Sequence, residues 1–140
     1  MDTRIPKWDE YFMEIAKTVS IRSKDPMTKV GAVVVNRDNH IVGTGYNGMQ
    51  PGVHETNELW QRPVKYEHVV HAEANCIQHS IQNVSGCTLY STLFPCVACA
   101  TLIKSAGISR VVYLDDKYDN EQTRTIFNSA NIVLERLCPT

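Results

Sequence analysis

No apolar run in this 140-residue chain approaches the roughly 20 residues that a membrane-spanning helix needs. The N-terminus opens into an amphipathic segment and lacks the apolar core of a signal peptide, so we expect a cytoplasmic protein with no membrane partner. Only 6 prolines and 7 glycines are present, too few for a chain dominated by linkers or low-complexity sequence. The expectation is therefore one globular domain that spans residues 1–140.

An excess of basic charge is also missing, because 14 Lys and Arg residues face 15 Asp and Glu residues and the net charge is −1. Domains that bind nucleic acid usually have a basic excess or a basic stripe, since phosphate neutralisation drives their binding. We therefore expect a small-molecule substrate and no nucleic-acid partner.

The five cysteines are an odd number in a chain without an export signal, which argues for reduced thiols and against a disulfide framework.

Hydrophobic periodicity predicts helices that alternate with strands. Helices are expected at about 7–21, 71–81, 96–106 and 120–130, and strands at 31–35, 40–46, 87–91, 110–114 and 132–134. The first two strands should form a hairpin, which adds one antiparallel neighbour, whereas the later strands alternate with helices and should pair in parallel. The strand at 31–35 is a continuous apolar run, which is typical of a strand covered on both faces. The prediction is an α/β fold with helices on both faces of one mixed sheet.

Two short motifs each begin a predicted helix: His71-Ala72-Glu73 and Pro95-Cys96-Val97-Ala98-Cys99. Cys96 and Cys99 are three residues apart on a first helical turn, so both sulfurs can reach one ion. A helix N-terminus also favours the thiolate form that zinc requires. With His71 as a nitrogen ligand, three protein ligands leave a fourth tetrahedral position open, which is typical of a catalytic zinc.

Glu73 lies two residues after His71 and should enter the same pocket without binding the metal. A zinc ion with an open position lowers the pKa of bound water, and a carboxylate is needed to take the proton. Glu73 would accept this proton, protonate N3 of a pyrimidine and later deliver a proton to leaving ammonia. The combination of His-x-Glu with Pro-Cys-x-x-Cys is the signature of zinc deaminases that act on nucleobases.

Other interpretations of these motifs stay open. A Cys-x-x-Cys pair also occurs as a redox pair or as half of a structural zinc site, whose fourth ligand would come from Cys76, Cys87, His68 or His79. None of these has the required spacing, and a structural site leaves Glu73 unexplained. A catalytically dead regulatory subunit is disfavoured by the complete ligand set. The alternative function is a deaminase of the same fold that acts on another cytosine or adenine substrate, including nucleic acid.

Nearly the whole chain resembles the deoxycytidylate (dCMP) deaminases. The narrowest matching stretches are Arg22-Ser23-Lys24-Asp25-Pro26 and Gly45-Tyr46-Asn47-Gly48-Met49. The resemblance implies a cytidine-deaminase-like α/β/α sandwich with a five-stranded mixed sheet, and one catalytic Zn²⁺ that serves the hydrolysis of dCMP to dUMP. It also implies a homohexamer that supplies dUMP for thymidylate synthesis, with dCTP (and Mg²⁺) as activator and dTTP as inhibitor.

Substrate and effector residues are expected near the two stretches and the zinc motifs. A nucleotide phosphate needs charged donors at the pocket mouth, and the candidates are Arg22, Ser23, Lys24, Lys29, Lys117 and Tyr118, each of which could instead be a solvated surface group. The residues expected in the substrate site are Asn47 (toward the sugar), Ala72, Pro95, Ser23, Lys24 and Tyr118. By resemblance, the effector site includes Lys29, Gly45, Tyr46 and Gly48. The segment 51–70 has no cysteine, so a second, structural zinc is not expected.

Overall fold

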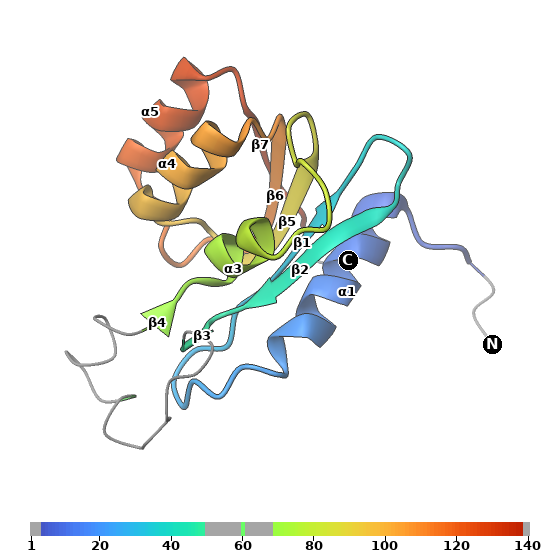
Figure 1. Cartoon of the computed structure of the whole chain (residues 1–140), viewed down its shortest axis with the longest axis vertical. Helices are drawn as coiled ribbons and strands as arrows, with labels where there is room; N and C mark the ends of the chain where they lie inside the picture. Colours follow the sequence, from blue (N-terminus) through green and yellow to red (C-terminus); the bar gives the residue numbers. More distant parts are fainter. Residues whose placement is uncertain (1–3, 50–59, 61–68, 139–140) are drawn as a thin grey trace.

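The computed structural model describes residues 4–49, 60 and 69–138. Its helices are α1 (Trp8–Ser20), α3 (Ala72–Gln78), α4 (Val97–Ala106) and α5 (Glu121–Ser129). Its strands are β1 (Gly31–Val35), β2 (Ile41–Tyr46), β3 (Gly48–Met49), β4 (Val69–Val70), β5 (Thr88–Leu93), β6 (Arg110–Asp115) and β7 (Val133–Arg136). Every predicted helix and strand is present, whereas the short ladder of β3 with β4 was not predicted (Figure 1).

The main sheet has five strands in the order β2-β1-β5-β6-β7. Strand β1 is antiparallel to both β2 and β5, and β6 is parallel to both β5 and β7. The predicted mixed sheet is confirmed, but β1 has two antiparallel neighbours where one was expected. The reason is that β2 and β5 run in the same direction with β1 between them, so that the connection through α3 passes over β1.

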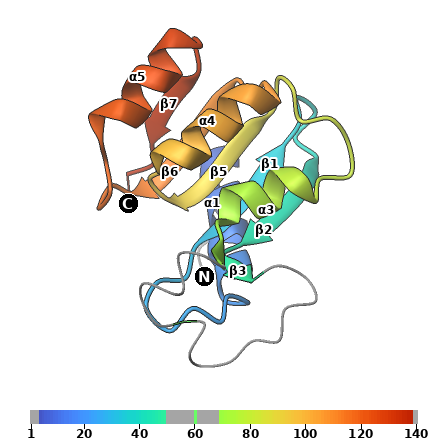
Figure 2. The same ribbon diagram turned by 60° about the vertical axis from the view of Figure 1, so that its left-hand side comes forward.

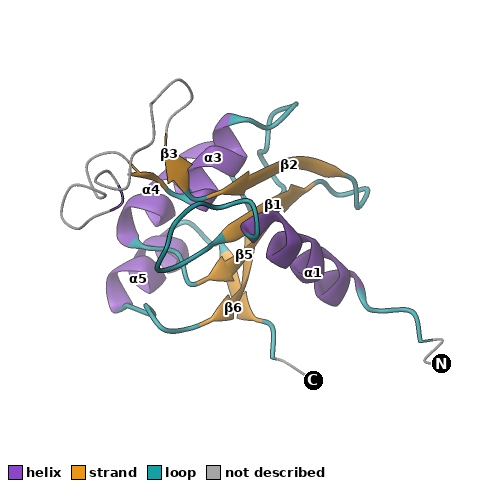
Figure 3. Ribbon diagram, turned by 90° about the horizontal axis from the view of Figure 1, so that it is seen from below, coloured by secondary structure: helices purple, strands orange, loops and turns teal. Residues whose placement is uncertain are grey.

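Helices cover both faces of the sheet, with α1 on one face and α3, α4 and α5 on the other (Figures 1 and 3). Strand β1 is buried along its whole length because its side chains alternate between two cores. Val33 and Val35 pack with Phe12 under α1, and Ala32 and Val34 pack in the core under the other helices. The expected α/β/α sandwich is confirmed. No helix of the described segments has both the length and the apolar character to cross a bilayer.

Two glycines in β2 allow α3 to approach the sheet closely. A Cβ atom at Gly45 would overlap with the backbone nitrogen of Cys76 and lie 2.5 Å from the carbonyl oxygen of Ala72. A Cβ atom at Gly43 would lie 2.8 Å from the carbonyl oxygen of Cys76. Any side chain at these positions would push α3 away from β2, and α3 begins directly after His71. The glycines therefore fix the height of the zinc motif above the sheet.

A polar cluster fastens the start of α1 to the sheet. Asp9 accepts hydrogen bonds from Nη1 and Nη2 of Arg110 at 3.0 and 2.7 Å, and from the Tyr90 hydroxyl at 2.6 Å. Arg110 also forms an ion pair with Glu135 of β7 at 3.2 Å. The hydrogen bonds from Arg110 hold the pKa of Asp9 below its ordinary value of 3.8, and the bond from Tyr90 acts in the same direction.

Asp9→Asn should lower the free energy of unfolding by about 1–2 kcal/mol near neutral pH, because it removes the charge from a bidentate pair that is only partly shielded from water. A lowered folded-state pKa means that Asp9 stabilises the protein above its unfolded pKa and that this contribution disappears as pH falls through the folded value. Denaturant unfolding of both proteins between about pH 7 and pH 3 should show curves that converge at the acidic end. A difference in the free energy of unfolding that stays constant down to pH 3 would contradict the lowered pKa of Asp9. Glu14→Gln, which affects only an exposed pair with Lys17, is the control.

Candidate metal centre and active site

Three potential metal ligands come together where α3 and α4 begin, two helices that lie side by side on one face of the sheet (Figure 2). His71 precedes α3, Cys96 precedes α4, and Cys99 lies in the first turn of α4. The Nδ1 atom of His71 lies 3.4 Å from Sγ of Cys96 and 3.3 Å from Sγ of Cys99. All three ligand atoms lie within 4.8 Å of one another. The structure thus brings together the residues that the sequence predicted as ligands.

The spacing of these atoms fits a tetrahedral zinc ion. With Zn–S bonds of about 2.3 Å and Zn–N bonds of about 2.0 Å, neighbouring ligand atoms of a tetrahedron lie about 3.5 Å apart. Within residues 4–49, 60 and 69–138, no other group of three His, Cys, Asp or Glu side chains has this arrangement. Cys76 and Cys87 are buried in the hydrophobic core, and His79 is exposed at the end of α3. His68, the remaining candidate for a fourth ligand, lies outside the described residues.

The charge of the ligand group also suits a divalent cation. The pKa of the Cys96 thiol is lowered to about 3, first by the hydrogen bond from the Cys99 thiol and then by His71, while burial opposes the shift. The pKa of Cys99 is raised because its proton is held in that same hydrogen bond, because it is buried and because the Glu73 carboxylate is near. Without a cation, Cys96 is therefore the thiol that ionises and Cys99 keeps its proton, whereas a Zn²⁺ ion would allow both sulfurs to ionise.

Glu73 is 4% exposed and faces the ligand group from the first turn of α3. Its Oε1 accepts a hydrogen bond from the Ser91 hydroxyl at 2.8 Å, and its Oε2 lies 3.3 Å from Sγ of Cys99. One carboxylate oxygen is therefore held by β5 and the other faces the ligands. The sequence predicted the position of Glu73 but not the contact with Ser91. The sequence feature that could have indicated this contact is the hydroxyl residue Ser91 at a core-facing position of a buried strand.

A cavity of about 330 Å³ opens beside the ligand group, a size within the range of small-molecule sites. Of the predicted substrate residues, Asn47, Ala72 and Tyr118 line it. Pro95 does not, and its carbonyl instead accepts a hydrogen bond from the Thr123 hydroxyl at 3.1 Å, which ties the start of α4 to α5. The lining residues that sequence reasoning did not assign to the site are Asp25, Thr28, Val30, Val69, Leu93 and Phe94.

The side chain of Asn47 organises the loop before β1. Its Nδ2 donates to Oδ2 of Asp25 at 3.1 Å and to the carbonyl of Thr28 at 2.9 Å. Its Oδ1 accepts from the backbone N–H of Val30 at 2.8 Å. Ser23 is buried, donates its hydroxyl to the backbone carbonyl of Asn47 at 2.8 Å and is not part of the cavity lining. Both residues therefore hold the loop that forms one wall of the cavity, a structural task beyond the substrate contacts predicted for them.

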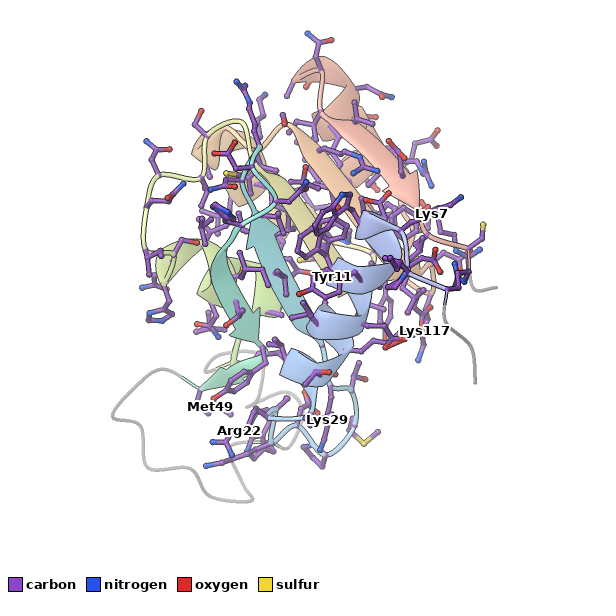
Figure 4. All side chains as sticks on the ribbon, turned by 90° about the vertical axis from the view of Figure 1, so that its right-hand side faces the viewer. Lys7, Tyr11, Arg22, Lys29, Met49 and Lys117 are labelled. Carbon is purple, nitrogen blue, oxygen red and sulfur yellow. The ribbon has the colours of Figure 1, made fainter. Side chains whose placement is uncertain are left out.

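Of the predicted phosphate donors, Tyr118 lines the cavity. The lining does not include the others, which are Arg22, Ser23, Lys24, Lys29 and Lys117. Lys24 and Lys29 are exposed on the loop before β1. Figure 4 shows Lys29 and Arg22 at the end of the molecule where Met49 of β3 lies. Tyr118 is 45% exposed, and Nζ of Lys117 lies 5.3 Å from the centroid of its ring. Which of these residues contacts a phosphate stays a prediction.

Of the residues expected at an effector site, Gly45 and Tyr46 contact α3 and Gly48 belongs to a short strand ladder. Gly45 is covered by α3, and the carbonyl of Tyr46 accepts a hydrogen bond from Nδ2 of Asn75 in α3 at 2.9 Å. Gly48 pairs with Val70 in the ladder of β3 with β4. Lys29, by contrast, is exposed. The segment therefore has a packing role in this fold, and its role in effector binding stays a prediction.

Comparison with known proteins agrees with this geometry. Residues 6–115 match the family model of the cytidine and deoxycytidylate deaminase zinc-binding region. Deoxycytidylate deaminase of Mus musculus is 43% identical over 144 residues, which cover 95% of this chain and 81% of that protein. Deoxycytidylate deaminase of Mycobacterium phage D29 is 41% identical over 126 residues, which cover 77% of this chain and 94% of that protein. The structure of dCMP deaminase from cyanophage S-TIM5 in complex with dCMP and dUMP matches with a TM-score of 0.80 at 28% identity, covering 96% and 99% of the two chains. The chain therefore belongs to the cytidine and deoxycytidylate deaminase family.

Proposed function

We propose that this protein is a zinc-dependent deaminase that hydrolyses dCMP to dUMP and ammonia. The observation that carries the proposal is the buried Glu73 carboxylate beside the group of His71, Cys96 and Cys99, at the wall of a cavity of about 330 Å³. The names of the mouse and phage relatives support dCMP as substrate, and so does the complex of the cyanophage protein with dCMP and dUMP.

Zinc held by the three ligands would supply Lewis-acid activation of a water molecule. The chain's own contribution is proton transfer by Glu73, whose Oε2 faces the ligands while Ser91 holds Oε1. This carboxylate would take a proton from the attacking water and pass it to N3 of the pyrimidine. It would then take the second proton, from the oxygen added to the ring, and deliver it to the amino group, which leaves as ammonia. Burial of Glu73 keeps bulk water from competing for these protons.

Recognition of the nucleotide is the next part of the proposal. Tyr118 lines the cavity and is partly exposed, so its ring could stack on the pyrimidine. Lys24 and Lys117, in the two loops beside the cavity, would form charge-assisted hydrogen bonds with the phosphate. The family resemblance further supports a homohexamer in the cytoplasm that supplies dUMP for thymidylate synthesis. It also supports activation by dCTP (with Mg²⁺) and inhibition by dTTP through the segment Gly45–Gly48.

A substrate panel tests the reaction and the choice of dCMP. The purified zinc protein should deaminate dCMP with a kcat/KM at least about tenfold above that for deoxycytidine, because each charge-assisted hydrogen bond to a phosphate is worth about 1.5–3 kcal/mol. Cytidine, CMP and a cytosine-containing single-stranded oligonucleotide complete the panel, each assayed with and without dCTP or dTTP. Turnover of the oligonucleotide in preference to dCMP would instead establish the alternative, a nucleic-acid deaminase. Identical dCMP saturation curves with and without dCTP would reject the proposed activation.

A further inference from the structure

Ser91 is a polar residue at the centre of the sheet with no exposed surface. Strand β5 lies between β1 and β6, and Ser91 is paired with Ala32 on one side and Tyr113 on the other. Alternate residues of β5 face the helices α3 and α4, so that Leu89 packs in their core while Leu93 reaches the cavity lining. Ser91 lies between these two residues on the same face, directly beneath Glu73.

The Ser91 hydroxyl contacts two acceptors at the same distance. Its Oγ lies 2.8 Å from Oε1 of Glu73 and 2.8 Å from the carbonyl oxygen of Leu93. A hydroxyl carries one proton and can donate to only one of these acceptors at a time. A carboxylate is the stronger acceptor, because hydrogen bonds to a charged group are shorter and about twice as strong as neutral ones. The proton of Ser91 therefore goes to Glu73.

This bond determines how Glu73 is oriented. A glutamate side chain has a broad terminal torsion, so its carboxylate rotates freely unless a partner fixes one oxygen. Within the described part of the chain, the Glu73 carboxylate accepts side-chain hydrogen bonds from the Ser91 hydroxyl on Oε1 and from the Cys99 thiol on Oε2. Cys99 would lose its proton on binding a metal ion, which leaves Ser91 as the donor that holds the carboxylate. With Oε1 fixed by β5, Oε2 is directed toward the ligand group, 3.3 Å from Sγ of Cys99.

We propose that Ser91 is the positioning residue of the active site, which sets the rotation of the Glu73 carboxylate so that Oε2 faces the reacting atoms. The inference rests on the proposed role of Glu73 in proton transfer. Ser91 itself does not line the cavity, and its side-chain hydrogen bonds among the described residues go to Glu73 and Leu93, not to a metal ligand. It acts through Glu73 alone, and it should therefore affect turnover without affecting the binding of nucleotide.

The test compares Ser91→Val with Ser91→Thr, which have nearly the same shape but differ in the hydroxyl group, and adds Ser91→Ala as the smaller variant. The valine and alanine variants should lose about tenfold in kcat, the effect expected for a lost hydrogen bond to a charged group, while KM stays unchanged. The threonine variant should recover most of this loss. Thr92→Val is the matched control, because the neighbouring hydroxyl accepts a hydrogen bond from the N–H of Gly31 and does not contact Glu73.

Zinc content, the melting temperature and the affinity for dUMP are measured on every variant, since none of these requires turnover. Unchanged values together with the loss of kcat support positioning. A kcat equal to that of the unmodified protein, or a loss of kcat that follows a loss of zinc or of dUMP affinity, overturns it. If the unmodified protein deaminates another compound of the panel in place of dCMP, the choice of substrate fails, and the same variants are compared on that compound.

Discussion

Glu73→Gln should reduce kcat for dCMP by about 100- to 10,000-fold, the range over which a positioned general acid–base group contributes. Glutamine keeps the size of the side chain, and its amide oxygen can still accept the hydrogen bond from Ser91, but it cannot take up or release a proton. The fold and the ligand group should stay intact, since Glu73 is not one of the three clustered ligands. The substitution therefore separates proton transfer from metal binding.

Three measurements on the glutamine variant make this prediction decisive. Zinc content and the melting temperature should match those of the unmodified protein, and dUMP should still bind. Glu121→Gln serves as the control, because this glutamate is exposed in the first turn of α5 and away from the cavity. A Glu73→Gln protein that retains zinc and turns over dCMP within a factor of about three of the unmodified protein would remove Glu73 from the proton-transfer role.

Local pattern was sufficient to predict the helices and strands but not all of their ends. The helix expected at 71–81 ends at Gln78, because His79 leaves the helical region with φ −102° and ψ 12°. The Ser80 hydroxyl then donates to the carbonyl of Cys76, which satisfies an acceptor at the end of the helix. Such a side-chain bond competes with the next backbone bond, and the periodicity of apolar residues does not reveal it.

The positions of the two hairpin strands in the sheet agree with a difference in apolar content that is visible in the sequence. The run Gly31–Val35 is apolar throughout, which predicts a strand covered on both faces, and β1 is indeed buried along its length. The second strand contains exposed Thr44 and two glycines, which suits an edge position beside α3. A comparison of the two hairpin strands therefore favours an interior position for β1 and an edge position for β2. It does not identify β5 as the second neighbour of β1, which depends on the path of the chain through α3.

The candidate site shows the same division between local and long-range information. Cys96 and Cys99 could be predicted as a pair because helix geometry directs both sulfurs to one side. His71 and Glu73, although His71 is 25 residues from Cys96, could be predicted because His-x-Glu and Pro-Cys-x-x-Cys together form a known signature. Ser91 and Asp25 could not, because their contacts with Glu73 and Asn47, which are 18 and 22 residues away, belong to no such signature. These residues shape the site through register and loop packing, which depend on the whole fold.

Cys99→Ala should lose bound zinc and activity together, the second large effect that we expect. Cys99 is 3% exposed and belongs to the group in which all ligand atoms lie within 4.8 Å, so its removal leaves two ligands that no longer enclose an ion. Zinc affinity should fall by more than about 100-fold, since even the outer partners of metal ligands change affinity by about 10- to 100-fold. Metal analysis after dialysis, together with kcat for dCMP, measures both losses.

Thermal unfolding adds a readout that does not depend on catalysis. A ligand that binds only the folded state raises the free energy of unfolding, so added zinc should raise the melting temperature of the unmodified protein and a chelator should lower it. The Cys99→Ala variant should respond to neither addition, whereas Cys138→Ser, which removes an exposed thiol outside the ligand group, should behave like the unmodified protein. A Cys99→Ala protein with full zinc occupancy would reject the ligand assignment. Because the first turn of α4 would then not be holding the ion, hydrolysis at this cavity would require a different metal centre or none.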